Sequence, residues 1–329
     1  AARASLFCCS HFKEDRSMIY FEVLLLAAGL FMLVKGADWF VCGTSGIAAR
    51  YGISQLVIGL TVVAMGTSAP EASVSITAAL NNSADITMGN IVGSNILNIL
   101  IILGITALVA PIGINRSTIR KDIPFLIVIT ILFLIFAVTG NVVNIFEGAI
   151  FIIIFILYML YLFKQSKKNE YNAEENHAEK KMAAWKMWAL AVIGLAVVVI
   201  GSKITVNSAK YIAHEAGMSE KFIGLTIVAL GTSLPELFTS VLAAIRGKAD
   251  IAIGNIVGSN VFNILAVIGI SAVITPVYCK QGFAFDIGVA VASAFLLLAL
   301  AIRKKRLNRI SGLIMLTAYA VYFICIIGK

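Results

Sequence analysis

Long apolar segments dominate this sequence and restrict the folds that it can form. Ten of them follow one another, separated by short polar connections, and most are long enough to cross a bilayer as a helix of roughly 20 residues. Only 13% of the 329 residues are charged, whereas soluble domains carry about 25%. We therefore expect an all-α polytopic membrane protein with ten transmembrane helices, at about 19–42, 56–80, 86–111, 123–138, 145–163, 183–206, 222–245, 251–277, 283–302 and 310–327.

The basic residues predict how these helices are oriented. They gather in the connections that follow the odd-numbered helices, most densely at Arg303, Lys304, Lys305, Arg306 and Arg309. Short loops rich in Lys and Arg stay in the cytoplasm. Both termini are then expected outside, and the net charge of +9 reports orientation rather than a nucleic-acid partner.

Three further features divide the chain. Residues 1–17 are polar and contain no Met, so we expect a non-native or disordered tail before Met18. Residues 164–182 carry mixed charge and are expected to form a cytoplasmic hinge loop between a first five-helix repeat, 18–163, and a second, 183–329. The five cysteines lack metal-ligand spacing, so neither a zinc site nor a disulfide framework is expected.

One stretch of sequence occurs twice. Ile58–Gly104 reads IGLTVVAMGTSAPEASVSITAALNNSADITMGNIVGSNILNILIILG, and Ile223–Gly269 reads IGLTIVALGTSLPELFTSVLAAIRGKADIAIGNIVGSNVFNILAVIG, at a constant offset of 165 residues. Because five helices separate the copies, the second must enter the membrane the other way up. Such inverted-topology repeats are typical of secondary transporters, whose site lies where the halves meet. Duplicated halves could also form only a symmetric scaffold, but the shared residues include Gly, Thr, Ser, Pro, Glu and Asn, which are costly at membrane depth and usually functional.

The first polar cluster of each half surrounds a proline. Pro70 and Pro235 remove a backbone donor and should break their helices, freeing carbonyls near Ala64 and Ala229 to bind a ligand. A glutamate follows each proline directly. Irregular backbone at this depth is tolerated where it lines a cavity. The side chains of this cluster are Thr67, Ser68 and Glu71, with Thr232, Ser233 and Glu236 in the second half.

The second polar cluster lies on the next helix of each half. Ser94 and Asn98 are four residues apart, as are Ser259 and Asn263, so each pair shares a helix face. The remaining asparagines, Asn90, Asn95, Asn255 and Asn260, could bond between helices as readily as contact a ligand. The glycines of both segments have a Gly-xxx-Gly spacing that allows close helix approach.

These residue types indicate the chemistry of the site. Carboxylates, hydroxyls, amide oxygens and carbonyls are hard donors, which suit Ca²⁺ or Na⁺ and disfavour zinc, copper or iron. Two ionised glutamates in a dry membrane need compensation, which one Ca²⁺, two Na⁺ or two protons would supply. Mutually exclusive occupancy of one charge-balanced site is the simplest basis for exchange.

At these residues the sequence closely resembles the cation/calcium exchanger superfamily, in its prokaryotic sodium/calcium exchanger branch. The two GTS-x-PE motifs match its repeat signature, where the proton-coupled branch carries GN-x-x-E. The resemblance implies that Glu71 and Glu236 bind Ca²⁺ with backbone oxygens of Thr67 and Thr232. It implies that the Na⁺ sites, which share both glutamates, draw on Ala64, Ser68 and Ser94, and on Ala229, Ser233 and Ser259.

The resemblance also implies three Na⁺ per Ca²⁺, a prokaryotic inner membrane location and no cofactor apart from the transported ions. Asn98 matches a central position of the family. Asn263 is an aspartate in some archaeal and potassium-dependent relatives, so we do not expect potassium co-transport. We expect a transporter that functions as a monomer, not an enzyme.

Other readings stay open. A proton/calcium antiporter could use the same two glutamates. A cation channel would need a filter ring and oligomeric symmetry, and an intramembrane hydrolase would need a nucleophile that neither glutamate has beside it. Asp38 and Lys203 occupy equivalent positions of the two halves and could form a gate or a surface pair.

Overall fold

The computed structural model describes residues 2–81, 83–166, 182–218, 229–279 and 283–327. Within them, eight helices are long and apolar enough to cross a membrane, and a bent pair makes up to nine. The multi-pass helical architecture is therefore confirmed. The predicted segment 222–245 begins in residues that lie outside the described ones, so a tenth span stays a prediction.

The first half contains the helices up to residue 166. Three of its segments, named η, are π-helical. The elements are α1 (Ala2–Tyr51), α2 (Gln55–Ile58), η1 (Gly59–Val63), α3 (Ala64–Thr67), α4 (Ala69–Leu80), α5 (Ala84–Leu97), η2 (Asn98–Ile102), α6 (Leu103–Val109), η3 (Thr118–Asp122), α7 (Ile123–Thr139) and α8 (Ile145–Ser166).

The second half has a similar order of helices in its described part, although no π-helical segment precedes α16 there as η3 precedes α7. Its elements are α10 (Ala184–Glu215), α12 (Ala229–Thr232), α13 (Leu234–Ile245), α14 (Ala249–Phe262), η5 (Asn263–Ile268), α15 (Gly269–Ile274), α16 (Phe283–Lys304) and α17 (Arg309–Ile327). The expected hinge loop falls mostly on 167–181, outside the described residues.

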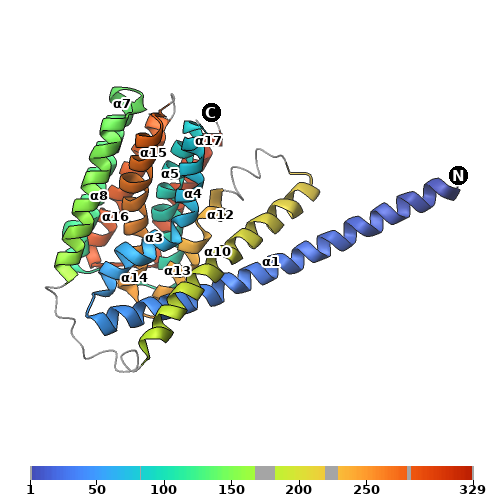
Figure 1. Cartoon of the computed structure of the whole chain (residues 1–329), viewed down its shortest axis with the longest axis horizontal. Coiled ribbons are helices and arrows are strands. Elements are labelled where there is room, and N and C mark those ends of the chain that lie inside the picture. The colour runs from blue at the N-terminus through green and yellow to red at the C-terminus, as the bar shows by residue number, and fades with distance from the viewer. Residues whose placement is uncertain (1, 82, 167–181, 219–228, 280–282, 328–329) are drawn as a thin grey trace.

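Helix α1 begins earlier than the sequence predicts. At residues 1–17, where we expected a non-native or disordered tail, the helix extends back to Ala2, and no Gly or Pro occurs before Gly29 to interrupt it. The apolar part of α1 is Met18–Tyr51. Figure 1 shows α1 projecting beyond the rest of the bundle at its N-terminal end.

Glycines bring α1 and α10 into direct backbone contact. A Cβ atom at Gly36 would lie 2.8 Å from the Val198 nitrogen and 2.9 Å from the Gly194 oxygen, and Gly29 approaches Gly201 in the same way. The contacts run in opposite sequence directions, so the two helices are antiparallel, and they cross side by side in Figure 1. Close approach at small residues is how helices associate in lipid, where the hydrophobic effect gives little drive.

The repeated helices α5 and α14, with the π-helical segments that follow them, occupy the middle of the bundle. Every residue from Ile251 to Val261 is buried. Gly254 and Gly258 let α14 approach the backbone of Gly59 and Leu60 on η1. The close packing expected from the Gly-xxx-Gly spacing is therefore present in the second half.

Two short antiparallel strand pairs, which we did not predict, accompany the helices. β1 (Ile112–Gly113) pairs with β4 (Arg306–Leu307), and β2 (Val142–Val143) pairs with β3 (Val277–Tyr278). All four lie in connections between helices, whose backbone groups need partners once no helix satisfies them. Each pair joins a connection of one half to a connection of the other.

Candidate functional site

Both proline-containing helices break at a serine. The axis of the second predicted span bends by 52° between Thr67 and Ala69, with Pro70 in the first turn of α4. In the second half, α12 ends at Thr232 and α13 starts after Ser233. The break predicted from each proline is confirmed, because its ring cannot continue the hydrogen-bond ladder of the preceding helix.

The two breaks face each other, and each glutamate is held by the serine of the opposite half. The hydroxyl of Ser68 donates to Oε1 of Glu236 at 2.8 Å, and that of Ser233 donates to Oε1 of Glu71 at 3.1 Å. Both carboxylates are buried, with exposed fractions of 1% for Glu71 and 0% for Glu236. The helix fragments α4 and α13 thus contribute one carboxylate each to a shared interior position.

The neighbouring helix supports each glutamate through an asparagine. Asn90 donates through Nδ2 to the Glu71 carbonyl at 3.1 Å and to Ser75 Oγ at 2.9 Å. In the second half, the Asn255 Nδ2 donates to Ser240 Oγ at 3.0 Å and to the Glu236 carbonyl at 3.5 Å. These asparagines therefore bond between helices. The buried serines at 75 and 240 were missed, although they recur at the same offset as the recognised motifs.

Four asparagines join α5 to α14 across the centre. Asn95 and Asn260 each donate from Nδ2 to the backbone carbonyl of the other, at 3.4 and 3.1 Å. Asn98 donates to Asn260 Oδ1 at 2.9 Å, and Asn263 donates to Asn95 Oδ1 at 3.2 Å. Asn263 also donates to Ser94 Oγ at 3.2 Å. These bonds use the amide NH₂ groups of all four side chains and the oxygens of Asn95 and Asn260, so only the oxygens of Asn98 and Asn263 keep no donor among the described residues.

Four buried oxygens of these residues accept no hydrogen bond from the described part of the chain. They are Oε2 of Glu71 and Glu236 and Oδ1 of Asn98 and Asn263. An unsatisfied buried acceptor costs about 1–3 kcal/mol, and more for a charged group. The set is symmetric under the offset of 165 residues. Neither glutamate forms an ion pair with a described side chain, so a cation or protons must supply the missing partner.

The other predicted ligands take varied places around this centre. Ser259 lies beside the first break, because its hydroxyl donates to the Ala64 carbonyl at 3.4 Å, and Ser94 donates to the Ile91 carbonyl of its own helix. The Ala64 carbonyl also accepts the Ser68 amide at 3.0 Å. Our expectation of a free carbonyl at Ala64 was wrong, since the last turn of α3 closes before the break.

The two threonines are also near the breaks. The Thr67 hydroxyl bonds to the Val63 carbonyl at 3.1 Å and contacts Asn255 Oδ1 at 3.1 Å. Thr232 ends α12 and lines a cavity that is described below. Ala229, the repeat counterpart of Ala64, is the first residue of α12, and the residues directly before it, 219–228, lie outside the described ones.

Three π-helical segments accompany the site, and sequence reasoning missed them. η2 starts at Asn98 and η5 starts at Asn263, the two residues whose oxygens stay unsatisfied, while η1 precedes the first break. A π-helical turn inserts an extra residue and re-aims the side chains that follow, which is why such turns are frequent at functional sites. No composition signal in these apolar runs distinguishes them from ordinary α-helix.

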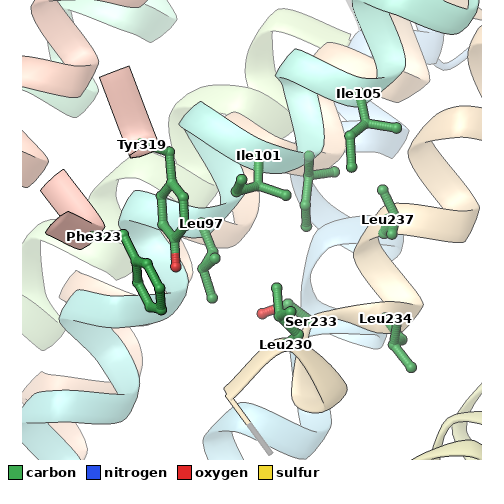
Figure 2. Close-up of a pocket in the computed structure, with 10 residues that line it drawn as sticks. Leu97, Ile101, Ile105, Leu230, Ser233, Leu234, Leu237, Tyr319 and Phe323 are labelled. Carbon is green, nitrogen blue, oxygen red and sulfur yellow. The ribbon is translucent and has the colours of Figure 1, made fainter. Parts of the chain in front are cut away.

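Two cavities reach the second break from different directions. One, of about 300 Å³, lies between α5, α13 and α17, with Ser233 at one end and Tyr319 and Phe323 across from it, as Figure 2 shows. The other, of about 390 Å³, lies between α4 and α10 and reaches Gly231 and Thr232. The first is lined mainly by Leu and Ile, whereas the second contains polar and basic side chains.

Comparisons with known proteins agree with this geometry. The family model described as sodium/calcium exchanger protein matches residues 21–164 and 186–328. The chain is 41% identical to the putative antiporter CaxA of Alkalimonas amylolytica, over 91% of this chain and 96% of that protein. It is 31% identical to the sodium/calcium exchanger MaX1 of Methanosarcina acetivorans, over 93% and 99% of the respective chains.

A solved structure has the same fold. It is the sodium-calcium exchanger NCX_Mj soaked with 2.5 mM Na⁺ and 10 mM Sr²⁺, which is 31% identical and covers 93% of this chain and 99% of its own, with a TM-score of 0.81. A family match in both halves and full-length relatives above 30% identity leave one assignment. This chain belongs to the sodium/calcium exchanger family.

Proposed function

We propose that this protein is a secondary antiporter that exchanges Ca²⁺ for Na⁺ across the membrane by alternating access. The observation that carries the proposal is the pair of buried glutamates, each bonded by the serine of the other half and each keeping one oxygen without a partner. The family membership and the likeness to NCX_Mj support exchange of Ca²⁺ against another cation.

The cargo ions are bound, in this proposal, by oxygens from both halves. Glu71 and Glu236 ligate Ca²⁺, helped by backbone oxygens of Thr67 and Thr232. The Na⁺ ions use the same carboxylates together with Ala64, Ser68 and Ser94 from one half and with Ala229, Ser233 and Ser259 from the other. At Ala64 the ion replaces the long bond that the carbonyl accepts from Ser259, while the bond from the Ser68 amide stays. Asn98 and Asn263 present their unsatisfied amide oxygens to the same interior, and amide oxygens are good ligands for both ions.

Charge balance makes the two loads exclusive. Two buried carboxylates without a described counter-ion are stable only when positive charge compensates them. One Ca²⁺ or two Na⁺ achieves this, so either load lets the neutralised site pass through an occluded state. If three Na⁺ exchange for one Ca²⁺, the third Na⁺ exceeds what the two carboxylates neutralise, so one net charge crosses per cycle, worth about 2.3 kcal/mol per 100 mV.

The ten-helix, inverted-repeat architecture forms part of the proposal. Two matches to one family model support an internal duplication. The contacts support it too, because three bonds between the halves have a counterpart with the halves exchanged: Ser68 to Glu236 and Ser233 to Glu71, Asn95 to Asn260 and the reverse, and Asn98 to Asn260 and Asn263 to Asn95. An odd number of helices in each half then makes the copies antiparallel in the membrane.

The proposed setting is a prokaryotic inner membrane, with both termini outside and the basic connections in the cytoplasm. The protein works as a monomer in this proposal, since the site is completed by two halves of one chain.

The coupling ion separates the proposal from its alternative, a proton/calcium antiporter. Purified protein in proteoliposomes should take up ⁴⁵Ca²⁺ when Na⁺ is loaded inside, at a pH clamped equal on both sides. Replacing internal Na⁺ by K⁺ should abolish the uptake. Uptake that requires a pH gradient and ignores Na⁺ would replace the proposal by the proton-coupled reading.

A further inference from the structure

The two broken helices are covered differently on their two sides. On one side, α1 packs against α13 through an apolar cluster, which we call the plug. Its α13 side chains are bulky, and its members on α1 and α10 are 0% exposed. The plug consists of Leu33, Ala37 and Val198 with Leu234, Phe238 and Leu242 packed against them.

The equivalent place in the other half is hollow. In the repeat, the counterpart of α13 is α4, and the counterpart of α1 is α10. Between α4 and α10 lies the cavity of about 390 Å³. Its lining includes Ser73, Ser202, Asn207, Lys203 and Lys210 and reaches the second break at Thr232. This side of the site is therefore open where the other is filled.

The sequence explains the difference, because the repeat is broken at the plug. Phe238 and Leu242 correspond to Ser73 and Thr77, and Leu234 corresponds to Ala69. Small or polar side chains on α4 cannot fill the space that Phe and Leu fill on α13. The asymmetry is thus encoded in the side chains, while the ion-binding motifs beside them stay nearly identical.

An ion pair joins α1 to α13 on the side of the plug. Arg246, the residue that caps the C-terminus of α13, bonds through Nη2 to Oδ1 of Asp38 on α1. The repeat counterpart of Asp38 is Lys203, and that of Arg246 is Asn81. A lysine and a neutral amide cannot form an ion pair. An ion pair therefore joins α1 to α13, and the two equivalent positions of the α10–α4 interface cannot form one.

We propose that Asp38 and Arg246 form a one-sided latch that stabilises the conformation in which α1 closes on α13 while the α4–α10 cavity is open. The inference rests on the proposed function, since a latch has meaning only if the two sides open in turn. By the proposed orientation, Arg246 follows helix seven and lies on the cytoplasmic side, so the latch favours the outward-open state. Opening inward requires separating the pair and the plug together.

Thiol accessibility tests the latch without measuring transport. Two reporters, Ser73→Cys in the cavity and Leu242→Cys in the plug, are placed separately in a background whose five native cysteines are replaced. A membrane-impermeant thiol reagent is applied to proteoliposomes from either side. Asp38→Asn and Arg246→Gln should slow labelling at 73 and speed labelling at 242 by about two- to fivefold, the range for a partly exposed ion pair.

Three controls sharpen the test. Glu22→Gln removes an acidic side chain from the same helix, and Arg309→Gln removes a basic one from α17; neither should change the labelling rates. The double variant Asp38→Arg with Arg246→Asp should restore them, because it rebuilds the pair with reversed charge. High salt should reduce the difference between the unmodified and neutralised proteins, since salt screens exposed pairs.

The outcomes separate the latch from the exchange proposal. Labelling rates that stay unchanged in both Asp38→Asn and Arg246→Gln would overturn the latch. Phe238→Ser, which removes a plug side chain, shows whether the two reporters respond to opening of the plug. If they do respond and the charge-reversed double variant still fails to restore the original labelling rates, the latch is also overturned. Labelling shifts in a protein that moves Ca²⁺ without Na⁺ would support the latch and overturn only the choice of sodium as coupling ion.

Discussion

At the scale of single residues, the site depends on oxygens whose partners come from the other half of the chain. Glu71 and Glu236 are each close in sequence to a serine, yet the serine that bonds each carboxylate is 162 or 168 residues away. Such cross-bonding leaves the second oxygen of each of these two carboxylates without a hydrogen-bond partner among the described residues. The site therefore depends on how the two breaks are positioned relative to each other as much as on the residues of either break.

Replacing either glutamate by glutamine should abolish Ca²⁺ exchange and leave membrane insertion intact. Glutamine keeps the volume of the side chain but removes the charge that a divalent ion needs in a buried site. Sodium-driven ⁴⁵Ca²⁺ uptake and detergent-extracted yield, measured for Glu71→Gln and Glu236→Gln, check both parts. Robust exchange by either variant would refute the paired-carboxylate site.

Removing the cross-bonding hydroxyls should weaken ion binding less severely. Ser68→Ala and Ser233→Ala each delete one hydrogen bond to a carboxylate, and bonds to charged groups contribute roughly 1.5–3 kcal/mol. We expect the Ca²⁺ concentration for half-maximal exchange to rise by about tenfold or more. Ser73→Ala, which alters a cavity-lining hydroxyl outside this bond pair, serves as the matched control; an equal effect there would argue against the cross-bonds.

At the scale of helices, the sequence predicted where the elements lie and where they break. Apolar length located the helices, and the positions of Pro70 and Pro235 located the breaks. It did not predict the π-helical starts at Asn98 and Asn263, because an inserted residue in an apolar run leaves no compositional trace. The prediction of a free carbonyl at Ala64 was wrong for a related reason. The Ala64 carbonyl accepts the Ser68 amide, and residue spacing alone does not specify whether the last helical turn before a break keeps that bond.

The α1–α10 contact predicts a steric effect of a single methyl group. Gly36→Ala places a Cβ atom against the backbone of α10, so the two helices must separate, and overpacking of this kind costs about 1–3 kcal/mol. The melting temperature in detergent should fall. Gly288→Ala, on α16 where a Cβ atom would meet nothing within 4 Å, should leave it equal or higher, because alanine favours helix by about 1 kcal/mol. Equal loss in both variants would contradict the close approach.

At the scale of the whole molecule, the duplication could be predicted but its asymmetry could not. The constant offset between the copies indicated two related halves, and the family match to both halves agrees with that reading. The difference between Phe238 and Ser73 is visible in the sequence as one more mismatch. Only the packing of α13 on α1 shows that this mismatch separates a filled interface from a cavity.

The orientation predicted from the basic connections can be measured directly. Single cysteines in place of Arg50, in the last turn of α1, and of Arg309, the first residue of α17, should react with an impermeant reagent only after the inner membrane is made permeable. A cysteine at Gly217, in a connection after an even-numbered helix, should react in cells with an intact inner membrane. The opposite pattern would invert the proposed orientation and assign the latch to the outer side.

The strand pairing between the halves also constrains how the protein is made. β1 belongs to the connection after the third predicted helix, but its partner β4 lies just before α17, the last helix. During synthesis the first half must therefore remain unfinished in the bilayer: Glu71 lacks its donor until Ser233 has been inserted, and β1 lacks its partner until nearly the whole chain has been inserted. For most of its translation the chain therefore exposes polar groups without partners, and it is then a substrate for quality-control factors that recognise such groups in the membrane.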